Sequence, residues 1–170
     1  MNRGLERLNS LAAEEAAAAL LKCCGSTLWA RRMAAARPFD DERELLAAAD
    51  STWWSLDERD WLEAFNRHPK IGEKKAALAQ DADARRWSAE EQAGTQAASQ
   101  ETKRLLAEVN REYEAKFNYI FIICATGKTS AEMLASCLER LNNDPATELR
   151  VAAEEQRLIT HLRLQKLLEQ

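Results

Sequence analysis

The stretch WLEAFNRHPKIG, residues 61–72, marks a point where a helical pattern has to stop. Trp61 and Phe65 recur at helical spacing, and His68 and Pro69 follow within about one turn. Proline disfavours the α conformation in the residue before it, so His68 is pushed into an extended or turn geometry. A titratable ring is therefore held at a rigid corner. Such a ring serves either as a functional group or as a neutral surface histidine at a helix end.

The residues on both sides of this corner predict an all-α fold. Among 170 residues there are only 5 glycines and 3 prolines, whereas alanine, leucine and glutamate, all strong helix formers, are abundant. A chain of this length buries roughly 70% of its unfolded surface, so it needs no disulfide or metal to be stable. We therefore predict a single compact domain, residues 1–170, of about eight helices.

Local start signals indicate where these helices begin. Capping boxes, in which Ser or Thr is followed three residues later by Glu, open helices at Ser55, Ser88 and Thr129. The stretch 81–86 is typical of a polar loop, and the helix that opens at Ser88 is expected to be the longest, reaching about Lys116. The other expected helices begin at Ser10, at Ser26, at Asp40 or Asp41, at about Lys74, and at Pro145 behind the N-cap Asp144.

Phe117–Ala125, with the sequence FNYIFIICA, is the only strongly β-prone run in the chain. A lone strand has no sheet to join, so we expect a buried, extended connector near 117–125. Buried backbone amides need hydrogen-bond partners, and a polar ligand can supply some of them.

The charge distribution excludes several classes of partner. The chain has 24 basic and 28 acidic residues, a net charge of −4, with both signs interspersed. No basic face indicates nucleic acid or an anionic membrane. No stretch approaches the ~20 apolar residues of a membrane span, and Glu14 and Glu15 interrupt the N-terminal apolar run. We therefore expect a cytoplasmic protein.

The four cysteines are Cys23, Cys24, Cys124 and Cys137. Their spacing contains no CxxC pair, and adjacent cysteines rarely bridge each other, so we expect reduced, packed thiols and no metal site.

Ser88, Glu91 and Gln92 form a candidate binding segment with two interpretations. In the structural interpretation, Ser88 is an N-cap and Glu91 is its capping-box partner. In the functional interpretation, the free N–H groups at the same helix N-terminus bind an anionic ligand.

Arg163 is a second candidate, near the apolar residues Ile159 and Leu162. It is either a surface arginine whose aliphatic side chain covers the core, or an arginine whose guanidinium binds a carboxylate or urea-like carbonyl. His161, two residues away, lies on a different helical face and is expected to have no part in the site.

Gly127-Lys128-Thr129 resembles the end of a phosphate-binding loop. The first glycine of that motif would fall at position 122, which is Ile122, so the sequence favours a simple turn.

Short segments distributed along nearly the whole chain occur in the order of a known family. They are Cys23-Cys24-Gly25-Ser26 with Trp29, Arg37-Pro38-Phe39, Ala64-Phe65 leading to His68-Pro69-x-Ile71-Gly72, Ser88-x-x-Glu91-Gln92-x-Gly94, Phe121-Ile122-Ile123-Cys124-Ala125-x-Gly127-Lys128, Arg140-Leu141-x-Asn143-Asp144, and Ile159-x-x-x-Arg163-Leu164. In this series the chain resembles the 2-oxo-4-hydroxy-4-carboxy-5-ureidoimidazoline (OHCU) decarboxylase family of urate degradation. Each segment is weak by itself, but the ordered set is specific.

The resemblance implies an all-helical, usually dimeric, cofactor-free decarboxylase that converts the small ureide OHCU to (S)-allantoin and carbon dioxide. His68 matches the family's catalytic proton donor, and Glu91 and Arg163 match its other polar active-site residues. The positions that match ligand-contacting residues are Pro69, Ser88 and Gln92, together with the backbone of Phe121, Ile122, Ile123, Cys124 and Ala125.

The implied chemistry needs no cofactor, because the imidazolinone ring of OHCU can delocalise the electrons left by carbon dioxide. Connector amides would hold the ring carbonyl or ureido group, and Arg163 a carboxylate or carbonyl. Glu91 would either orient His68 or bind ureido N–H groups. Two alternatives stay open. A non-catalytic helical adaptor explains the fold but not why His68, Glu91 and Arg163 should meet, and a decarboxylase of a related ureido acid differs only in the shape of its cleft.

Overall fold

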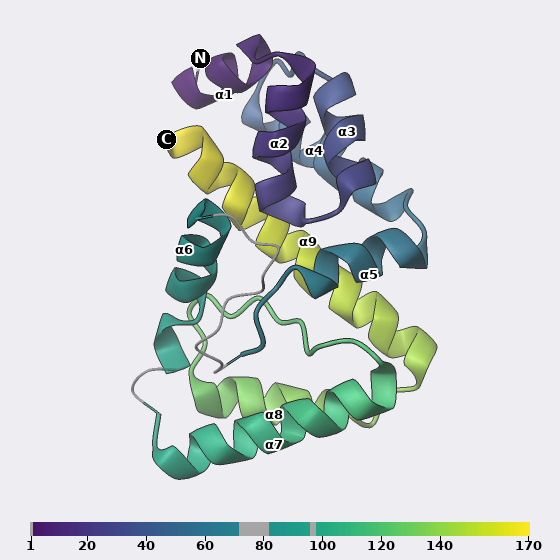
Figure 1. The fold of residues 1–170 in the computed structure, drawn as a ribbon, viewed down its shortest axis with the longest axis vertical. Helices are drawn as coiled ribbons and strands as arrows, with labels where there is room; N and C mark the ends of the chain where they lie inside the picture. Colours follow the sequence, from purple (N-terminus) through teal and green to yellow (C-terminus); the bar gives the residue numbers. More distant parts are fainter. Residues whose placement is uncertain (1, 72–81, 96–97) are drawn as a thin grey trace. The chain divides into compact units, whose positions relative to one another are not determined.

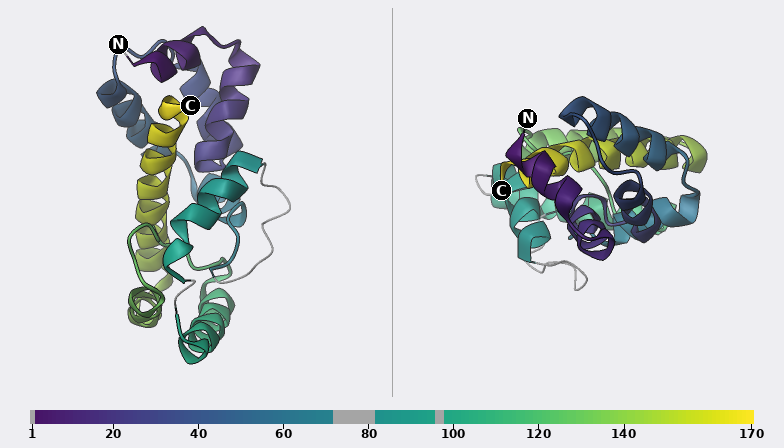
Figure 2. Two further views of the ribbon diagram at one scale, coloured as in Figure 1. Left: turned by 90° about the vertical axis from the view of Figure 1, so that its left-hand side faces the viewer. Right: turned by 90° about the horizontal axis from the view of Figure 1, so that it is seen from above.

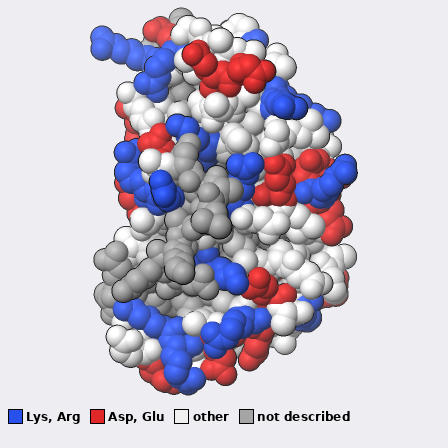
Figure 3. All heavy atoms as spheres, in the orientation of Figure 1, with Lys and Arg blue, Asp and Glu red and all other residues white. Residues whose placement is uncertain are grey.

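The computed structural model describes residues 2–71, 82–95 and 98–170, and its regular structure there is entirely helical (Figure 1), which confirms the predicted all-α class. None of the described helices combines the length and the apolar character that crossing a membrane requires. On the face drawn in Figure 3, acidic and basic side chains are interspersed. The helices are α1 (Arg3–Ser10), α2 (Ala13–Cys24), α3 (Thr27–Ala35), α4 (Glu42–Trp54), α5 (Glu58–Asn66), α6 (Ala82–Glu91), the 3-10 turn η1 (Ala93–Thr95), α7 (Gln100–Phe117), α8 (Ser130–Arg140) and α9 (Pro145–Glu169).

The chain divides into two compact units, which we describe separately. Unit 1 comprises Met1–Ala64 and Arg157–Gln170, and unit 2 comprises Phe65–Gln156. The divisions fall inside α5 and α9, so each of these helices contributes residues to both units. The single domain expected for residues 1–170 stays a prediction.

Unit 1 packs its helices around large apolar side chains such as Trp29 and Leu45, both fully buried. The helices α2 and α3 lie side by side, and the last part of α9 lies among the N-terminal helices (Figure 2). Gly4 permits a close approach there, because a Cβ at this position would lie 1.9 Å from the carbonyl oxygen of Leu168.

The turn between α2 and α3 follows the prediction. Gly25 ends α2 in the left-handed conformation, with φ of 89°, and the side chain of Ser26 accepts a hydrogen bond from the amide of Trp29. Glu63 of α5 adds two further contacts to this helix start, accepting from the amide of Thr27 at 3.1 Å and from its hydroxyl at 2.6 Å.

Unit 2 contains the predicted connector. Residues 118–125 follow α7 without helix or strand, and Phe121–Ala125 are all buried. The helices α7 and α8 pack against each other (Figure 1). Aromatic rings line the start of the connector, and Tyr113 contacts Phe117, Tyr119 and Phe121. The expectation of a buried, extended connector near 117–125 is confirmed.

Several predicted helix starts are wrong because another residue caps the helix. Ser10 is the last residue of α1, a helix that the sequence does not reveal, and its hydroxyl donates to the carbonyl of Arg7. Ser55 follows the end of α4, where its hydroxyl likewise donates to a carbonyl, that of Thr52. Asp57 takes its place at the start of α5, accepting from the amide of Asp60.

The interpretation of Ser88 as an N-cap is also wrong. Ser88 lies inside α6, which occupies the stretch expected to be a polar loop, and the expected long helix is divided. The division includes Gly94, where a Cβ would lie 2.3 Å from the carbonyl oxygen of Lys128. Ser99 then caps α7 by accepting from the amide of Thr102. The helix expected at 74–80 lies outside the described residues.

Two further start signals act as predicted. Thr129 and Glu132 form a reciprocal capping box at α8, and the carboxylate of Asp144 accepts from the amide of Thr147 at the start of α9. The sequence predicts these two starts correctly because each signal depends only on residues within one helical turn.

Candidate active site

His68 occupies the corner that the sequence predicted. The helix α5 ends at Asn66, and the amide of His68 donates to the carbonyl of Phe65 at 3.1 Å. The ring is half-buried, and its Nε2 lies 2.6 Å from Oε1 of Gln156 on α9. A buried side chain from a distant part of unit 2 therefore holds the ring of this histidine.

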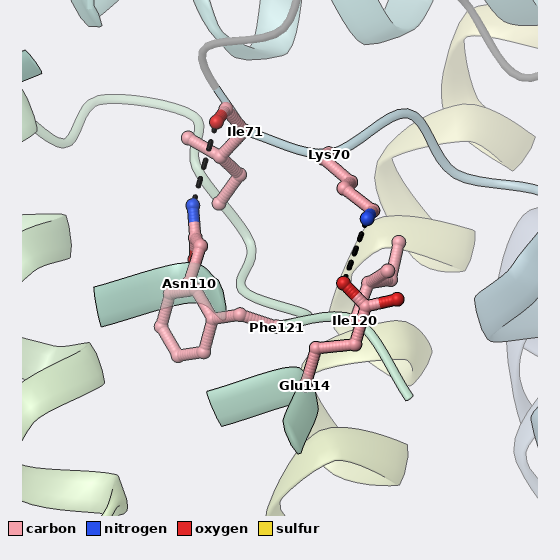
Figure 4. A pocket seen from close by; sticks show the side chains of 6 residues that line it. All are labelled: Lys70, Ile71, Asn110, Glu114, Ile120 and Phe121. Atoms are coloured by element: carbon pink, nitrogen blue, oxygen red, sulfur yellow. Dashed lines mark hydrogen bonds and ion pairs between the residues drawn. The ribbon is translucent and has the colours of Figure 1, made fainter. Parts of the chain in front are cut away.

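The segment that follows His68 is attached to α7. Nζ of Lys70 lies 2.7 Å from a carboxylate oxygen of Glu114, and Nδ2 of Asn110 donates to the carbonyl of Ile71 at 3.4 Å (Figure 4). These side chains border a hollow of about 180 Å³, counted to its open mouth, together with Ile120 and Phe121. The hollow is small and shallow, so we assign these contacts to bracing the corner that carries His68.

The connector is held by charged side chains on both sides of Cys124. The amide of Cys124 donates to Oε2 of Glu155 at 2.6 Å, and Nζ of Lys128 donates to the carbonyl of Cys124 at 2.7 Å. Glu155 and Gln156 are neighbours on α9, and consecutive Cα atoms are about 3.8 Å apart. One turn of α9 therefore meets both the ring of His68 and the backbone of the connector.

Glu91 acts on the same part of the connector. It is the last residue of α6, and its side chain is buried. Burial raises the pKa of the Cys124 thiol, Lys128 opposes that effect, and the negative charges of Glu155 and Glu91 raise the pKa further. The carboxylate of Glu91 is therefore close enough to act electrostatically on Cys124.

The other residues of the predicted binding segment lie beside Glu91. Ser88 is buried one turn earlier on α6, and the amide of Gln92 donates to its carbonyl at 3.1 Å. Gln92 and Pro69 are half-buried. Unit 2 thus contains the ring of His68, the carboxylate of Glu91 and the connector, linked through Cys124 and α9.

Arg163 belongs to unit 1. Only 3% of it is exposed, which excludes the interpretation as a surface arginine, and its Nη1 approaches the carbonyl of Lys22 at 3.5 Å. Burial raises the pKa of Cys24 to about 12, while the positive charge of Arg163 lowers that pKa. A buried guanidinium of this kind is a natural partner for a carboxylate or urea-like group.

Two other sequence features have structural explanations. Nε2 of His161 lies 2.6 Å from a carboxylate oxygen of Asp50, and Arg157 also pairs with that carboxylate at 3.2 Å, so His161 joins α9 to α4. Gly127 adopts a φ of 78° in a turn closed by the amide of Lys128 and the carbonyl of Ala125, as the simple-turn interpretation predicted.

The cysteines are explained by packing. All four cysteines are buried, reduced thiols, as expected. Within residues 2–71, 82–95 and 98–170, no group of three or more His, Cys, Asp or Glu side chains is arranged to hold a metal ion.

Sequence reasoning missed Glu155 and Gln156. The signal was the periodicity of α9, whose buried positions include Ala152, Ala153, Ile159 and Arg163. Gln156 falls on the same face at helical spacing and is fully buried, so it is a polar residue at a core position. Such a residue needs a partner, but the sequence does not name which one.

Comparison with known proteins gives a consistent result. The family model described as OHCU decarboxylase matches residues 9–165, across both units. The uric acid degradation bifunctional protein TTL of Arabidopsis thaliana is 41% identical over 130 residues, covering 76% of this chain and 40% of that protein. The 2-oxo-4-hydroxy-4-carboxy-5-ureidoimidazoline decarboxylase of Amia calva is 39% identical over 61 residues, 36% of this chain and 35% of that one. The matches thus span well under half the length of these curated relatives.

Solved structures agree on the fold. A crystal structure of OHCU decarboxylase in the presence of (S)-allantoin is 36% identical, with a TM-score of 0.76, and the match covers 94% of this chain and 100% of that one. A crystal structure of (S)-allantoin synthase shares the fold with a TM-score of 0.71 at 19% identity, covering 96% of this chain and 53% of that one. By the extent of the family match and the order of its segments, the chain belongs to the OHCU decarboxylase family.

Proposed function

We propose that this protein catalyses the cofactor-free, stereoselective decarboxylation of OHCU to (S)-allantoin and carbon dioxide in the degradation of urate. The observation that carries the proposal is the position of the His68 ring, whose Nε2 lies 2.6 Å from Oε1 of buried Gln156. Gln156 lies on the same turn of α9 that binds the connector through Glu155. Family membership and the relative crystallised in the presence of (S)-allantoin support the choice of substrate and product.

In this proposal His68 donates a proton to the intermediate that is left when carbon dioxide departs. Loss of carbon dioxide leaves an electron pair on the ring carbon C4, which the ring delocalises toward C5, the carbon that carries the ureido group and becomes the stereocentre of allantoin. A positioned acid that protonates this carbon from one face contributes about 10²–10⁴ in rate and sets the handedness of the product. Pro69 restricts the backbone of His68, and so restricts the direction from which the proton arrives.

The remaining residues bind and orient the substrate. Arg163 binds its carboxylate or a ring carbonyl, and Glu91 either orients His68 or accepts from ureido N–H groups. Pro69, Ser88, Gln92 and the connector backbone of 121–125 form the surrounding surface. Because the amide of Cys124 already donates to Glu155, a substrate oxygen bound at that amide replaces Glu155 as its acceptor.

We further propose that the chain acts as one domain, as a cytoplasmic homodimer. A family model that covers residues 9–165, across both units, supports the single domain. The dimer is carried over from the family resemblance, and the compartment from the reduced state expected of the four cysteines.

The proposed reaction is tested by generating OHCU from urate with urate oxidase and hydroxyisourate hydrolase, and following the product by circular dichroism. We expect the protein to accelerate formation of (S)-allantoin over spontaneous decay, which gives racemic product. An unchanged rate with racemic product refutes the proposal. Formation of an optically active product from a related ureido acid, but not from OHCU, would identify the other decarboxylase instead.

A substitution of His68 tests its role as the acid. His68→Asn removes the titrating ring from an otherwise unchanged corner, so we expect a normally folded protein that has lost about 10²–10⁴ in rate and most of its stereoselectivity. His161→Asn serves as the matched control, because the other histidine pairs with Asp50 in unit 1. Wild-type rate and pure (S)-product in His68→Asn contradict the assignment.

A further inference from the structure

Gln156 is a buried amide on the interior face of α9. None of its surface is exposed. A buried amide that lacks hydrogen bonds costs about 1–3 kcal/mol, so a glutamine at a core position is retained only where its polar atoms are engaged. Its side-chain oxygen is engaged with the ring of His68, 88 positions earlier in the chain.

The atoms of this contact determine where His68 carries its proton. Oε1 of Gln156 lies 2.6 Å from Nε2, and because this oxygen is an acceptor, the arrangement has Nε2 as the donor. A neutral imidazole has one N–H, and when that N–H is on Nε2 the second proton is gained and lost at Nδ1. The contact therefore selects one of the two tautomers of the neutral ring.

Both sides of the contact are attached to rigid parts of unit 2. Next to Gln156, Glu155 binds the amide of Cys124, and two turns earlier on α9 the buried carboxylate of Glu148 accepts from Nε of Arg140 at 2.8 Å. On the other side, His68 is bonded through its amide to Phe65. A functional group supported in this way keeps its orientation through a reaction.

We propose that Gln156 is a positioning residue that keeps a proton on Nε2 of His68, so that Nδ1 is the nitrogen that exchanges the proton during turnover. The consequence for catalysis rests on the proposed function, whereas the tautomer does not. Removing the acceptor frees the ring to rotate and to change tautomer, and misplacing a reacting group by about 1 Å can cost 10² in rate.

The tautomer is measured by ¹H–¹⁵N NMR of the ring nitrogens. The chain has two histidines, and His161→Asn removes the signals of the other one. In the wild type at a pH where the ring is neutral, we expect a protonated Nε2 and an unprotonated Nδ1. Finding the proton on Nδ1, or a mixture of both tautomers, overturns the inference without any substitution at Gln156.

Variants of Gln156 then connect the tautomer to the rate. Gln156→Met keeps the side-chain length without an acceptor, and we expect mixed tautomers and a kcat reduced about 10–100-fold with little change in KM. Gln156→Glu restores an oxygen acceptor, and we expect Nε2 to stay protonated and much of kcat to return. Gln165→Met is the control, since this exposed glutamine of α9 bonds only to Glu42 in the described structure.

The outcomes separate the inference from the proposed function. A single Nε2–H tautomer in a wild type that does not accelerate OHCU decay supports the tautomer assignment and refutes the proposed function. An active wild type, with Gln156→Met unchanged in both tautomer and kcat, refutes the role of Gln156 and leaves the proposed function standing.

Discussion

Glu155 and Gln156 are adjacent residues of α9 that hold different parts of unit 2. Glu155 accepts from the amide of Cys124 in the connector, and Gln156 contacts the ring of His68. Helix periodicity places Arg163 seven residues, close to two turns, beyond Gln156 along α9. Among the buried polar residues of α9, Gln156 carries a proposed role in positioning His68 and Arg163 a proposed role in binding the substrate.

Buried cysteines make the stability of the protein sensitive to alkali. Burial raises the pKa of Cys24 to about 12, from an ordinary value of 9.0. Above pH 9 the unfolded thiol loses its proton while the folded thiol keeps it, so the free energy of unfolding falls as pH rises, by about 1.4 kcal/mol per pH unit for each such thiol.

We therefore predict that Cys24→Ala flattens this decline between pH 9 and 11. Urea unfolding followed by circular dichroism at several pH values measures the slope, and the difference at pH 7.5 gives the cost of the lost side chain. Burial also raises the pKa of Cys137 to about 12, but this thiol is present in both proteins, so its effect on the difference in slope cancels. Parallel curves for wild type and variant would show that Cys24 titrates normally in the folded state.

At the scale of the element, the connector depends on a buried ion-pair network. Nη1 of Arg140 donates to the carbonyl of Ile122 at 2.7 Å, and its guanidinium lies 4.5 Å from the centre of the Phe121 ring. Glu148 is fully buried and accepts from Arg140 and from the hydroxyl of Tyr113. The network gives an irregular segment the hydrogen bonds that it would otherwise take from a sheet.

We predict that Arg140→Met lowers the free energy of unfolding by about 3–5 kcal/mol, because it leaves the carboxylate of Glu148 buried without its charged partner. Adding Glu148→Gln should recover part of the loss, since the unpaired charge is then absent. Urea unfolding measures both variants. Arg104→Met is the control, because this arginine pairs with Glu101 and Glu108 on an exposed face of α7 and its loss should change little. Equal losses for Arg140→Met and Arg104→Met would contradict the role of the network.

At the scale of the whole molecule, the family match spans both compact units, whose boundaries fall inside α5 and α9. The proposed catalytic residues are divided accordingly. His68 and Glu91 belong to unit 2, and Arg163 belongs to unit 1.

We predict that the full chain is a homodimer in solution, as the family resemblance implies. Size-exclusion chromatography with light scattering should give twice the mass of one chain at the concentration used for the activity assay. A monomer at that concentration with full activity would contradict the dimer while leaving the catalytic proposal intact.

The sequence by itself determined the all-α class, the corner at His68, the connector near 117–125, the family, and helix starts such as Thr129 and Asp144. Each of these follows from composition, from an ordered set of motifs, or from signals that act within a few residues, which do not depend on the rest of the chain. The tertiary structure decided which of several serines cap helices, because Asp57 and Ser99 compete with Ser55 and Ser88 and packing selects among them. It also decided the contacts of Glu155 and Gln156, since a hydrogen bond between residues 88 apart exists only when the fold brings them together.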